Sequence, residues 1–290
     1  VVYDKVGANP TLACVNEGAR IARENGCDFV TALGGGSVMD AAKAIALTAA
    51  NGENYWDFVS AGTGGGRAIT NAPLPLVVIT TTAGTGSEAD ATAVVTNPAT
   101  GEKIGFVHPG MFPVLSEVDS SLTKGVPPAL TAYQGFDALF HATECYVSNK
   151  ANKMSDMLAL TSAGYVSKYL ARAVKDGADE EARDGMSFAN MLSGMVMTLS
   201  GCTSKHGKEH AMSALSPSLP HGAGLIMLAP AYYAHMIEAH VCDDRFCALA
   251  KAMGKENCQG PSDFISVLKK LMSDCGVDLS LIHISEPTRP

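Results

Sequence analysis

The second half of the chain carries carboxylate and imidazole side chains at spacings that suit metal binding. Asp137 and His141 stand four residues apart, as do His206 and His210, and His221 follows a proline directly. On a helix, side chains four residues apart lie on one face about 6 Å from each other, close enough for both to reach one ion. Aspartate and histidine without a thiolate suit a divalent ion such as Fe, Zn, Mn or Co. The pattern therefore predicts a metal site.

The remaining histidines serve as a comparison for this prediction. A single Asp/His pair at this spacing is commonly a chance pair or an ion pair. Two pairs and a proline-fixed histidine, set among Ala, Leu and Met, favour the metal site instead. His108, His235 and His240 lack such neighbours, and we expect them to be surface or packing residues.

Small and hydroxyl-bearing residues in the first half suggest a second kind of site. Residues 34–37 (GGGS) stand between an apolar run and a helix-like segment, and residues 80–87 (TTTAGTGS) follow another apolar run. Backbone N–H groups in such a turn can approach a phosphate, and the helix dipole favours its negative charge. A tight strand-to-helix turn is the structural alternative. Two such segments at the carboxyl ends of parallel strands predict one nucleotide-binding crevice.

The elements around these residues divide the chain into two parts. Residues 1–126 alternate between helix-like segments and short apolar runs at 29–33 and 74–79, and a hairpin is expected around the turn at 97–101. This predicts an α/β dinucleotide-binding domain with a parallel sheet. Residues 127–278 hold Ala/Leu/Met-rich stretches near 129–148, 153–174, 179–200, 206–215, 222–240 and 243–253. They predict an all-α metal-binding domain.

Composition excludes several classes of protein. The 290 residues are 47% hydrophobic and 17% charged, with a net charge of −8, so disorder is excluded and a sizeable core is expected. No apolar run has the roughly 18 residues of a membrane helix, and no basic stripe indicates nucleic-acid binding. The eight cysteines include no C-x-x-C pair, which favours reduced thiols and a cytoplasmic protein.

Both ends of the sequence are unusual. The chain begins with Val1 and runs into a helix without a preceding strand, so we expect the sheet to be incomplete, with a first strand-helix unit before Val1 and further helices after Asp278. Residues 279–290 resemble a translated sequencing adaptor, and we expect a non-native tail there. A natural proline-ended tail is the alternative.

Taken together, the motifs resemble those of the iron-containing (group III) alcohol dehydrogenases. The matching segments are GGGSxxDxxK at 34–43, TTAGTGSE at 81–88, PP at 127–128, GxDAxxH at 135–141, and the stretch from His206 to the PHG at 220–222. The resemblance spans residues 1–278.

This resemblance implies a nucleotide-binding N-terminal domain, a helical C-terminal domain and a metal between them. The implied metal ligands are Asp137, His141, His206 and His221, and His210 would relay a proton. One residue more than expected separates His210 from His221, so the choice of His206 over His210 as ligand stays open. The implied cofactor contacts are Asn9, Gly35, Gly36, Ser37, Asp40, Thr81, Thr82, Thr85, Val94 and Lys103.

The reaction implied is the interconversion of an alcohol and an aldehyde or ketone by hydride transfer with NAD or NADP. The ion, Fe²⁺ or another divalent ion such as Zn²⁺, would bind the alcohol oxygen and favour the alkoxide. A small-molecule substrate and a homodimer of the full-length protein are further implications. Two alternatives stay open: a dehydroquinate synthase-like lyase that uses metal and NAD, and a fragment that binds metal or nucleotide without turnover.

Overall fold

The computed structural model describes residues 1–279 and divides the chain into two compact units. The first unit consists of Val1–Thr82 and Ser87–Asp119, and the second of Ala83–Gly86 and the chain from Ser120 onward. The sequence analysis predicted the boundary between residues 126 and 127. All but the first residue of the expected tail at 279–290 lies outside the described residues.

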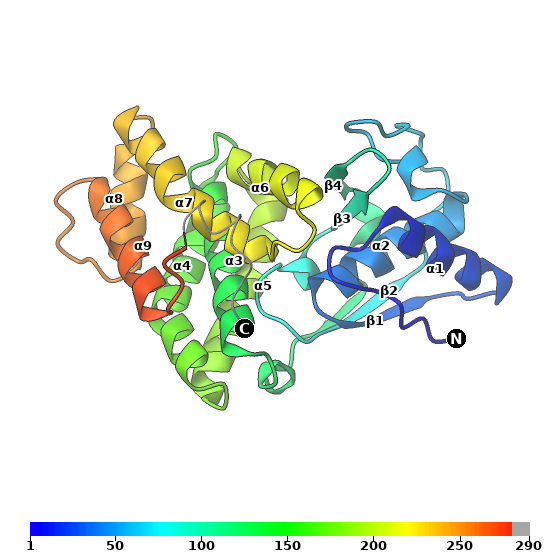
Figure 1. Cartoon of the computed structure of the whole chain (residues 1–290), viewed down its shortest axis with the longest axis horizontal. Coiled ribbons are helices and arrows are strands. Elements are labelled where there is room, and N and C mark those ends of the chain that lie inside the picture. The colour runs from blue at the N-terminus through cyan, green and yellow to red at the C-terminus, as the bar shows by residue number, and fades with distance from the viewer. Residues whose placement is uncertain (280–290) are drawn as a thin grey trace. The chain divides into compact units, whose positions relative to one another are not determined.

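A parallel sheet organises the first unit. Its strands are β1 (Val30–Gly34), β2 (Leu76–Thr80) and β5 (Leu115–Glu117), in the order β1-β2-β5. The register pairs Gly34 with Thr80, so the glycine turn and the threonine segment leave the sheet at the same edge (Figure 1). The predicted relationship between these two strand ends is thus present in the sheet.

Two helices and a hairpin complete this unit. Helix α1 (Leu12–Glu24) begins at the N-cap Thr11, and α2 (Gly36–Asn51) packs against α1, β1 and β3. Strands β3 (Thr92–Asn97) and β4 (Glu102–Val107) form the expected antiparallel hairpin. Short 3-10 helices span Tyr55–Asp57, Ser87–Ala89 and Pro109–Met111. Helix α2 is buried along most of its length because alanines fill the space between its neighbours.

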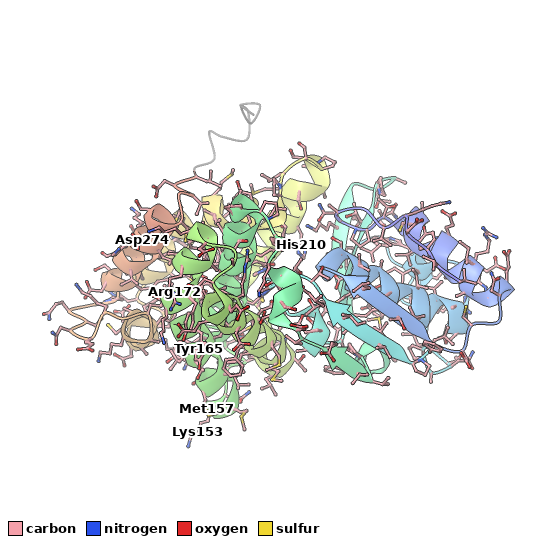
Figure 2. All side chains as sticks on the ribbon, turned by 90° about the horizontal axis from the view of Figure 1, so that it is seen from below. Lys153, Met157, Tyr165, Arg172, His210 and Asp274 are labelled. Carbon is pink, nitrogen blue, oxygen red and sulfur yellow. The ribbon has the colours of Figure 1, made fainter. Side chains whose placement is uncertain are left out.

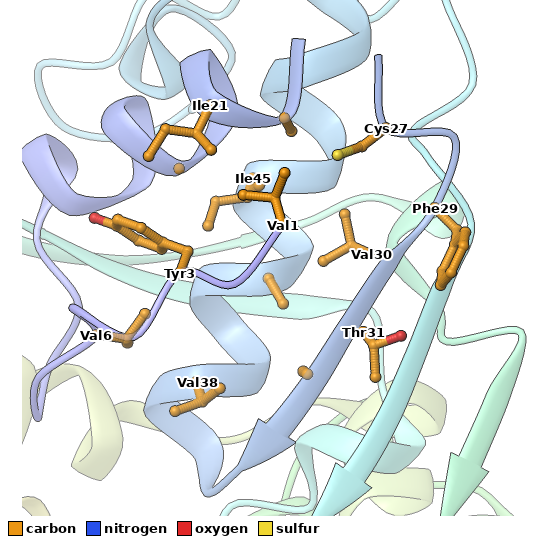
Figure 3. Close-up of a pocket in the computed structure, with 14 residues that line it drawn as sticks. Val1, Tyr3, Val6, Ile21, Cys27, Phe29, Val30, Thr31, Val38 and Ile45 are labelled. Carbon is orange, nitrogen blue, oxygen red and sulfur yellow. The ribbon is translucent and has the colours of Figure 1, made fainter. Parts of the chain in front are cut away.

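A mostly apolar cavity of about 150 Å³ lies between the N-terminal segment, α1, β1 and α2. Tyr3, Ile21, Val30 and Ile45 are among the side chains around it (Figure 3). It carries no cluster of polar groups, so it is a packing feature of this unit.

Helices build the second unit. They are α3 (Pro128–Tyr146), α4 (Lys153–Lys175), α5 (Glu180–Ser200), α6 (Ser204–Leu215), α7 (His221–Glu238), α8 (Asp243–Ala252) and α9 (Ser262–Asp274), with a 3-10 turn at Ser120–Thr123. Helix α3 is buried from Gly135 to Tyr146 and packs against α4, α5 and α7. An α/β unit followed by a helical unit confirms the predicted fold class.

Helix α4 shows how the sequence defines the helix ends. Asn152 accepts hydrogen bonds from the backbone of Met154 and Ser155, and the Ser155 hydroxyl forms the return half of a capping box. Tyr165 of this helix is labelled in Figure 2. Its ring packs edge-to-face on Phe188 of α5, with ring centroids 5.0 Å apart. None of the helices described by the structure is long and apolar enough to span a membrane.

Candidate metal centre

One carboxylate oxygen in the second unit is surrounded by three imidazoles. The Nε2 atoms of His206, His141 and His221 lie 3.2, 3.5 and 3.6 Å from Asp137 Oδ1. Asp137, His141 and His206 are at most 7% exposed. The four residues predicted as ligands are therefore brought together, although they come from three helices.

The spacing of these atoms fits a small cation. Four ligand atoms about 2.1 Å from a tetrahedral ion are separated by about 3.4 Å from one another. The contacts of Asp137 Oδ1 have this length, and the ligand atoms of Asp137, His206 and His221 lie within 4.8 Å of one another. An oxygen and imidazole donor set of this kind matches a borderline divalent ion.

Helix geometry explains how the residues converge. Asp137 and His141 share one face of α3, whereas His206 lies in the first turn of α6 and His221 is the first residue of α7. Gly222 lets α7 begin close to α3, because a Cβ atom there would lie 2.2 Å from the carbonyl oxygen of Tyr133. The glycine after His221 is thus required by packing.

Two buried glutamates that the sequence analysis did not identify contact the outer nitrogens of this cluster. Glu144 Oε1 lies 2.6 Å from His206 Nδ1, and Glu209 Oε2 contacts His221 Nδ1. Both glutamates are fully buried. Glu144 follows Asp137 by seven residues, two helical turns on the same face, so helical periodicity carried a signal for this residue.

A buried lysine accompanies Glu144. Lys205 is fully buried, its Nζ lies 3.3 Å from Glu144 Oε1, and it stands 3.5 Å from the centre of the Phe140 ring. Burial lowers the pKa of Lys205, and the Glu144 carboxylate opposes this. The ion pair and the cation–π contact together hold an ammonium group inside the helical core.

The pKa values of the clustered carboxylate and imidazole groups are shifted in different directions. Burial would raise the pKa of Asp137, but the imidazoles of His141, His221 and His206 outweigh it and hold that pKa well below its usual range. Burial lowers the pKa of His141 to about 3. Burial would also lower the pKa of His206, but Glu144 and Asp137 raise it to about 9. The carboxylates thus favour a positive charge among the imidazoles.

His210 borders the cluster from α6 (Figure 2). Its ring lies 5.4 Å from that of His221 and 6.5 Å from that of His206. Its nitrogen lies within 4.8 Å of ligand atoms of Glu209 and His221. Of the two α6 histidines, His206 is the one whose Nε2 lies 3.2 Å from Asp137, and this geometry favours His206 as the ligand.

The glycine turn of the first unit, residues 34–37, lies very close to the side chain of Thr82. Gly35 is the N-cap residue of α2. A Cβ atom on Gly35 would lie 2.7 Å from Thr82 Cγ2. Asn9 has a positive φ of 54° and donates its backbone N–H to Ser37 Oγ, 3.1 Å away. Asn9, Gly35, Gly36, Ser37 and Thr82 therefore belong to one neighbourhood, at the N-terminus of a 16-residue helix.

The other expected cofactor residues have different surroundings. Both Asp40 oxygens are hydrogen-bonded, to Ser87 Oγ at 2.6 Å and to the backbone N–H of Val94 at 2.9 Å. Thr81 donates its N–H to Gly34, next to the turn. Lys103 lies on β4, opposite Thr96, and Thr85 belongs to the second unit.

The loop that holds Thr85 packs on helices α3 and α5. Gly86 donates its N–H to Asn190 Oδ1, 2.7 Å away, and has a φ of 63°. A Cβ atom on Gly86 would lie 2.5 Å from the backbone nitrogen of Gly194, and one on Gly84 would lie 2.8 Å from Gln134 Cα. These glycines are therefore required for close packing, which the sequence analysis had not anticipated.

Comparison with known proteins agrees with this geometry. The profile of the family "Iron-containing alcohol dehydrogenase" matches residues 1–120, and that of the "Fe-containing alcohol dehydrogenase family, C-terminal" matches residues 131–285. The chain belongs to the iron-containing alcohol dehydrogenase family, as its motifs indicated.

Individual relatives fit this assignment. Alcohol dehydrogenase 4 of Schizosaccharomyces pombe is 40% identical over 221 residues, which are 76% of this chain and 51% of that protein. An NAD-dependent methanol dehydrogenase of Bacillus methanolicus is 34% identical, over 90% of this chain and 66% of its own. The crystal structure of an archaeal alcohol dehydrogenase from a Red Sea brine pool superposes with a TM-score of 0.93 at 36% identity, over 99% of this chain and 74% of that one. The chain spans about half to two thirds of the curated relatives it matches.

Proposed function

We propose that the protein interconverts an alcohol and an aldehyde or ketone, using a divalent metal ion and a nicotinamide nucleotide. The observation that carries this proposal is the convergence of three imidazole Nε2 atoms on Asp137 Oδ1 at 3.2 to 3.6 Å. Membership of the family supports the same reaction, because two relatives of this chain are named as an alcohol dehydrogenase and a methanol dehydrogenase.

Asp137, His141, His206 and His221 would hold the ion. When bound there, a divalent ion supplies a Lewis acid for the oxygen of the alcohol or carbonyl group. Fe²⁺ is our choice of ion because of the family, and Zn²⁺ or another divalent ion suits the same donor atoms. The burial of Asp137 and His141 limits the water that can compete for this position.

We assign proton transfer to His210. Its ring lies 5.4 Å from that of His221, which supports this role, because an imidazole nitrogen beside the cluster would accept the hydroxyl proton of the alcohol. The same nitrogen returns the proton when a carbonyl group is reduced. Glu144 and Glu209, which contact the outer nitrogens of His206 and His221, would keep these two histidines oriented during this transfer.

The nucleotide would bind at the strand ends of the first unit. The N-terminus of α2 presents the backbone N–H groups of Gly36 and Ser37, which suit a pyrophosphate. Asn9, Gly35, Thr81 and Thr82 adjoin this turn and remain our candidates for contacts, together with Asp40, Thr85, Val94 and Lys103. We favour NAD because a relative is named as NAD-dependent, with NADP as the alternative.

The surroundings of the lysines argue against a lyase that binds a polyanion. Lys205 is fully buried against Phe140 and Glu144, and Lys208 Nζ donates to Ser204 Oγ at 2.8 Å. The two lysines nearest the histidines therefore have other roles. A small alcohol or aldehyde suits the site better.

The remaining parts of the proposal concern assembly and location. We propose a homodimer from the resemblance to the family, and a cytoplasmic protein from the eight cysteines, all of which are free thiols.

The test is an assay of nicotinamide reduction. Protein loaded with Fe²⁺ without oxygen should reduce NAD when a simple primary alcohol or a diol is added, and protein treated with a chelator should not. Activity that persists after the metal has been removed and verified to be absent would overturn the proposal.

A further inference from the structure

The three histidines around Asp137 differ at their outer nitrogens. His206 Nδ1 meets Glu144 at 2.6 Å, and His221 Nδ1 meets Glu209. His141 Nδ1 is buried and has no hydrogen-bond partner among the residues that the structure describes. Two of the three imidazoles are therefore fixed by a carboxylate, and the third is fixed by its place on α3 and by stacking on His206, with ring centroids 4.3 Å apart.

A hydrogen bond at Nδ1 decides which nitrogen can bind a cation. An imidazole that donates its Nδ1–H to a carboxylate carries a lone pair on Nε2. In His206 and His221, Nε2 is the atom that faces Asp137 Oδ1. Each glutamate therefore selects the tautomer that presents a ligand atom to the centre of the cluster.

Glu144 also accepts hydrogen bonds from the N-terminus of α6. Its Oε2 accepts hydrogen bonds from Thr203 Oγ1 at 3.1 Å and from the backbone N–H groups of Lys205 and His206 at 3.2 and 3.4 Å. The N-cap residue Thr203 makes no side-chain capping bond of its own. A carboxylate from α3 thus caps α6 and orients the histidine in its first turn.

The charges of the buried groups also favour a dication. Asp137, Glu144 and Glu209 contribute three negative charges, and Lys205 contributes one positive charge, which leaves two negative charges among groups that are at most 4% exposed. With neutral imidazoles, one divalent ion would make this set neutral. Removing either glutamate charge would leave an excess positive charge once the ion is bound.

We propose that Glu144 and Glu209 are positioning residues that fix His206 and His221 as Nε2 ligands for the divalent ion. This inference rests on the metal site of the proposed function. It concerns the affinity for the ion, so it can be tested without turnover.

The experiment measures Co²⁺ binding to chelator-treated protein by competition with a chromophoric chelator. Glu144→Gln and Glu209→Gln should each weaken binding by about 10 to 100-fold. Glu180→Gln is the matched control, since Glu180 pairs with Lys124 on the surface, and it should bind like the wild type. The absorption spectrum of bound Co²⁺ should change in the first two variants only, because the ligand geometry relaxes.

Nitrogen NMR of the histidine side chains provides a readout that a purely structural role would not affect. In ion-free wild-type protein, the neutral imidazole of His221 should carry its proton on Nδ1 rather than on Nε2, and Glu209→Gln should reduce this preference at His221 while leaving His206 unchanged. If Glu144→Gln does not fold, the Glu209 variant decides the question, because Glu209 lies within α6 itself and contacts His221 directly.

The outcomes separate the two proposals. Wild-type protein that binds no Co²⁺, Zn²⁺ or Fe²⁺ would contradict the proposed function. Wild-type protein that binds the ion, together with folded glutamate variants that bind it within twofold of the wild type, would contradict this inference and leave the proposed function standing.

Discussion

The carboxylate of Asp137 and the imidazole of His206 lie 3.2 Å apart, although 69 residues separate them in the sequence. The contact joins the middle of α3 to the first turn of α6. His210, one helical turn further along α6, borders His221 instead. His206 and His210 should therefore have different roles in the site.

The first prediction separates those two roles. His206→Ala should lose both the bound ion and turnover, because it removes a ligand. His210→Ala should retain about one ion per chain and lose turnover by about 10² to 10⁴-fold, the usual contribution of a positioned acid–base group. Metal analysis and the NADH assay on both variants would test this. A metal-free His210→Ala protein beside a metal-loaded His206→Ala protein would reverse our assignment.

The second prediction concerns the close approach of Gly35 to Thr82. A Cβ atom at residue 35 would lie 2.7 Å from Thr82 Cγ2, so Gly35→Ala must displace the turn in which we place the pyrophosphate. We expect NADH affinity to fall at least tenfold, or about 1.4 kcal/mol, with Co²⁺ binding unchanged. Gly7→Ala is the control, since a Cβ there meets no neighbouring atom within 4 Å in the described part of the chain. Fluorescence titration that gives equal NADH affinities for both variants would exclude this position.

The third prediction concerns the buried ion pair of the first unit. Lys43 is fully buried and donates to Asp90 Oδ1 at 2.7 Å, to Ser87 Oγ at 2.8 Å and to the carbonyl oxygen of Thr92 at 2.9 Å. Lys43→Met leaves the Asp90 carboxylate without its cation, which typically costs about 3 to 5 kcal/mol. Denaturant unfolding should show this loss. A change below about 1 kcal/mol would mean that the pair contributes little to stability.

The fourth prediction concerns pH and Asp40. Burial raises the pKa of Asp40 from 3.8 to about 6, and Lys43 opposes the shift. Because the folded state holds this proton more tightly than the unfolded state does, the stabilisation is complete below about pH 4 and is lost as the pH rises through 6. The melting temperature of the wild type relative to Asp40→Asn should therefore fall between pH 4 and pH 7. A difference that is constant over this range would contradict the raised pKa.

Much of the fold could be predicted from local sequence patterns. The Ala-rich stretch of α2, the hairpin turn at 97–101 and the helix-length runs of the second unit each depend on nearby residues, and the corresponding elements are present. Helix α9 was not predicted, although Phe264, Leu268 and Leu271 have the spacing of one helix face. Strand β5 is three residues long and exposed, so its sequence carries no alternation to recognise.

The site was predictable to the extent that chemistry is visible in residue types. Helical spacing grouped Asp137 with His141 and His206 with His210, and His221 stood out because it follows a proline. The choice of Asp137, His141, His206 and His221 as the ligand set came from the resemblance to the family. Helical spacing places Glu144 on the face of Asp137, but it does not show burial. Charged residues on helices are usually solvated, and only packing shows that Glu144, Glu209 and Lys205 are buried. The packing role of Gly84 and Gly86 likewise depends on helices far along the chain.

The measurement that tests the central claim most directly is metal stoichiometry with and without His221. Wild-type protein should bind one Co²⁺ per chain with the absorption spectrum of a tetrahedral nitrogen and oxygen site, and saturation at 100 times Kd should stabilise the fold by about 2.7 kcal/mol. His221→Ala should lose the spectrum and the stabilisation together. An unchanged spectrum and an unchanged metal-dependent rise in melting temperature in His221→Ala would show that the ion is held elsewhere.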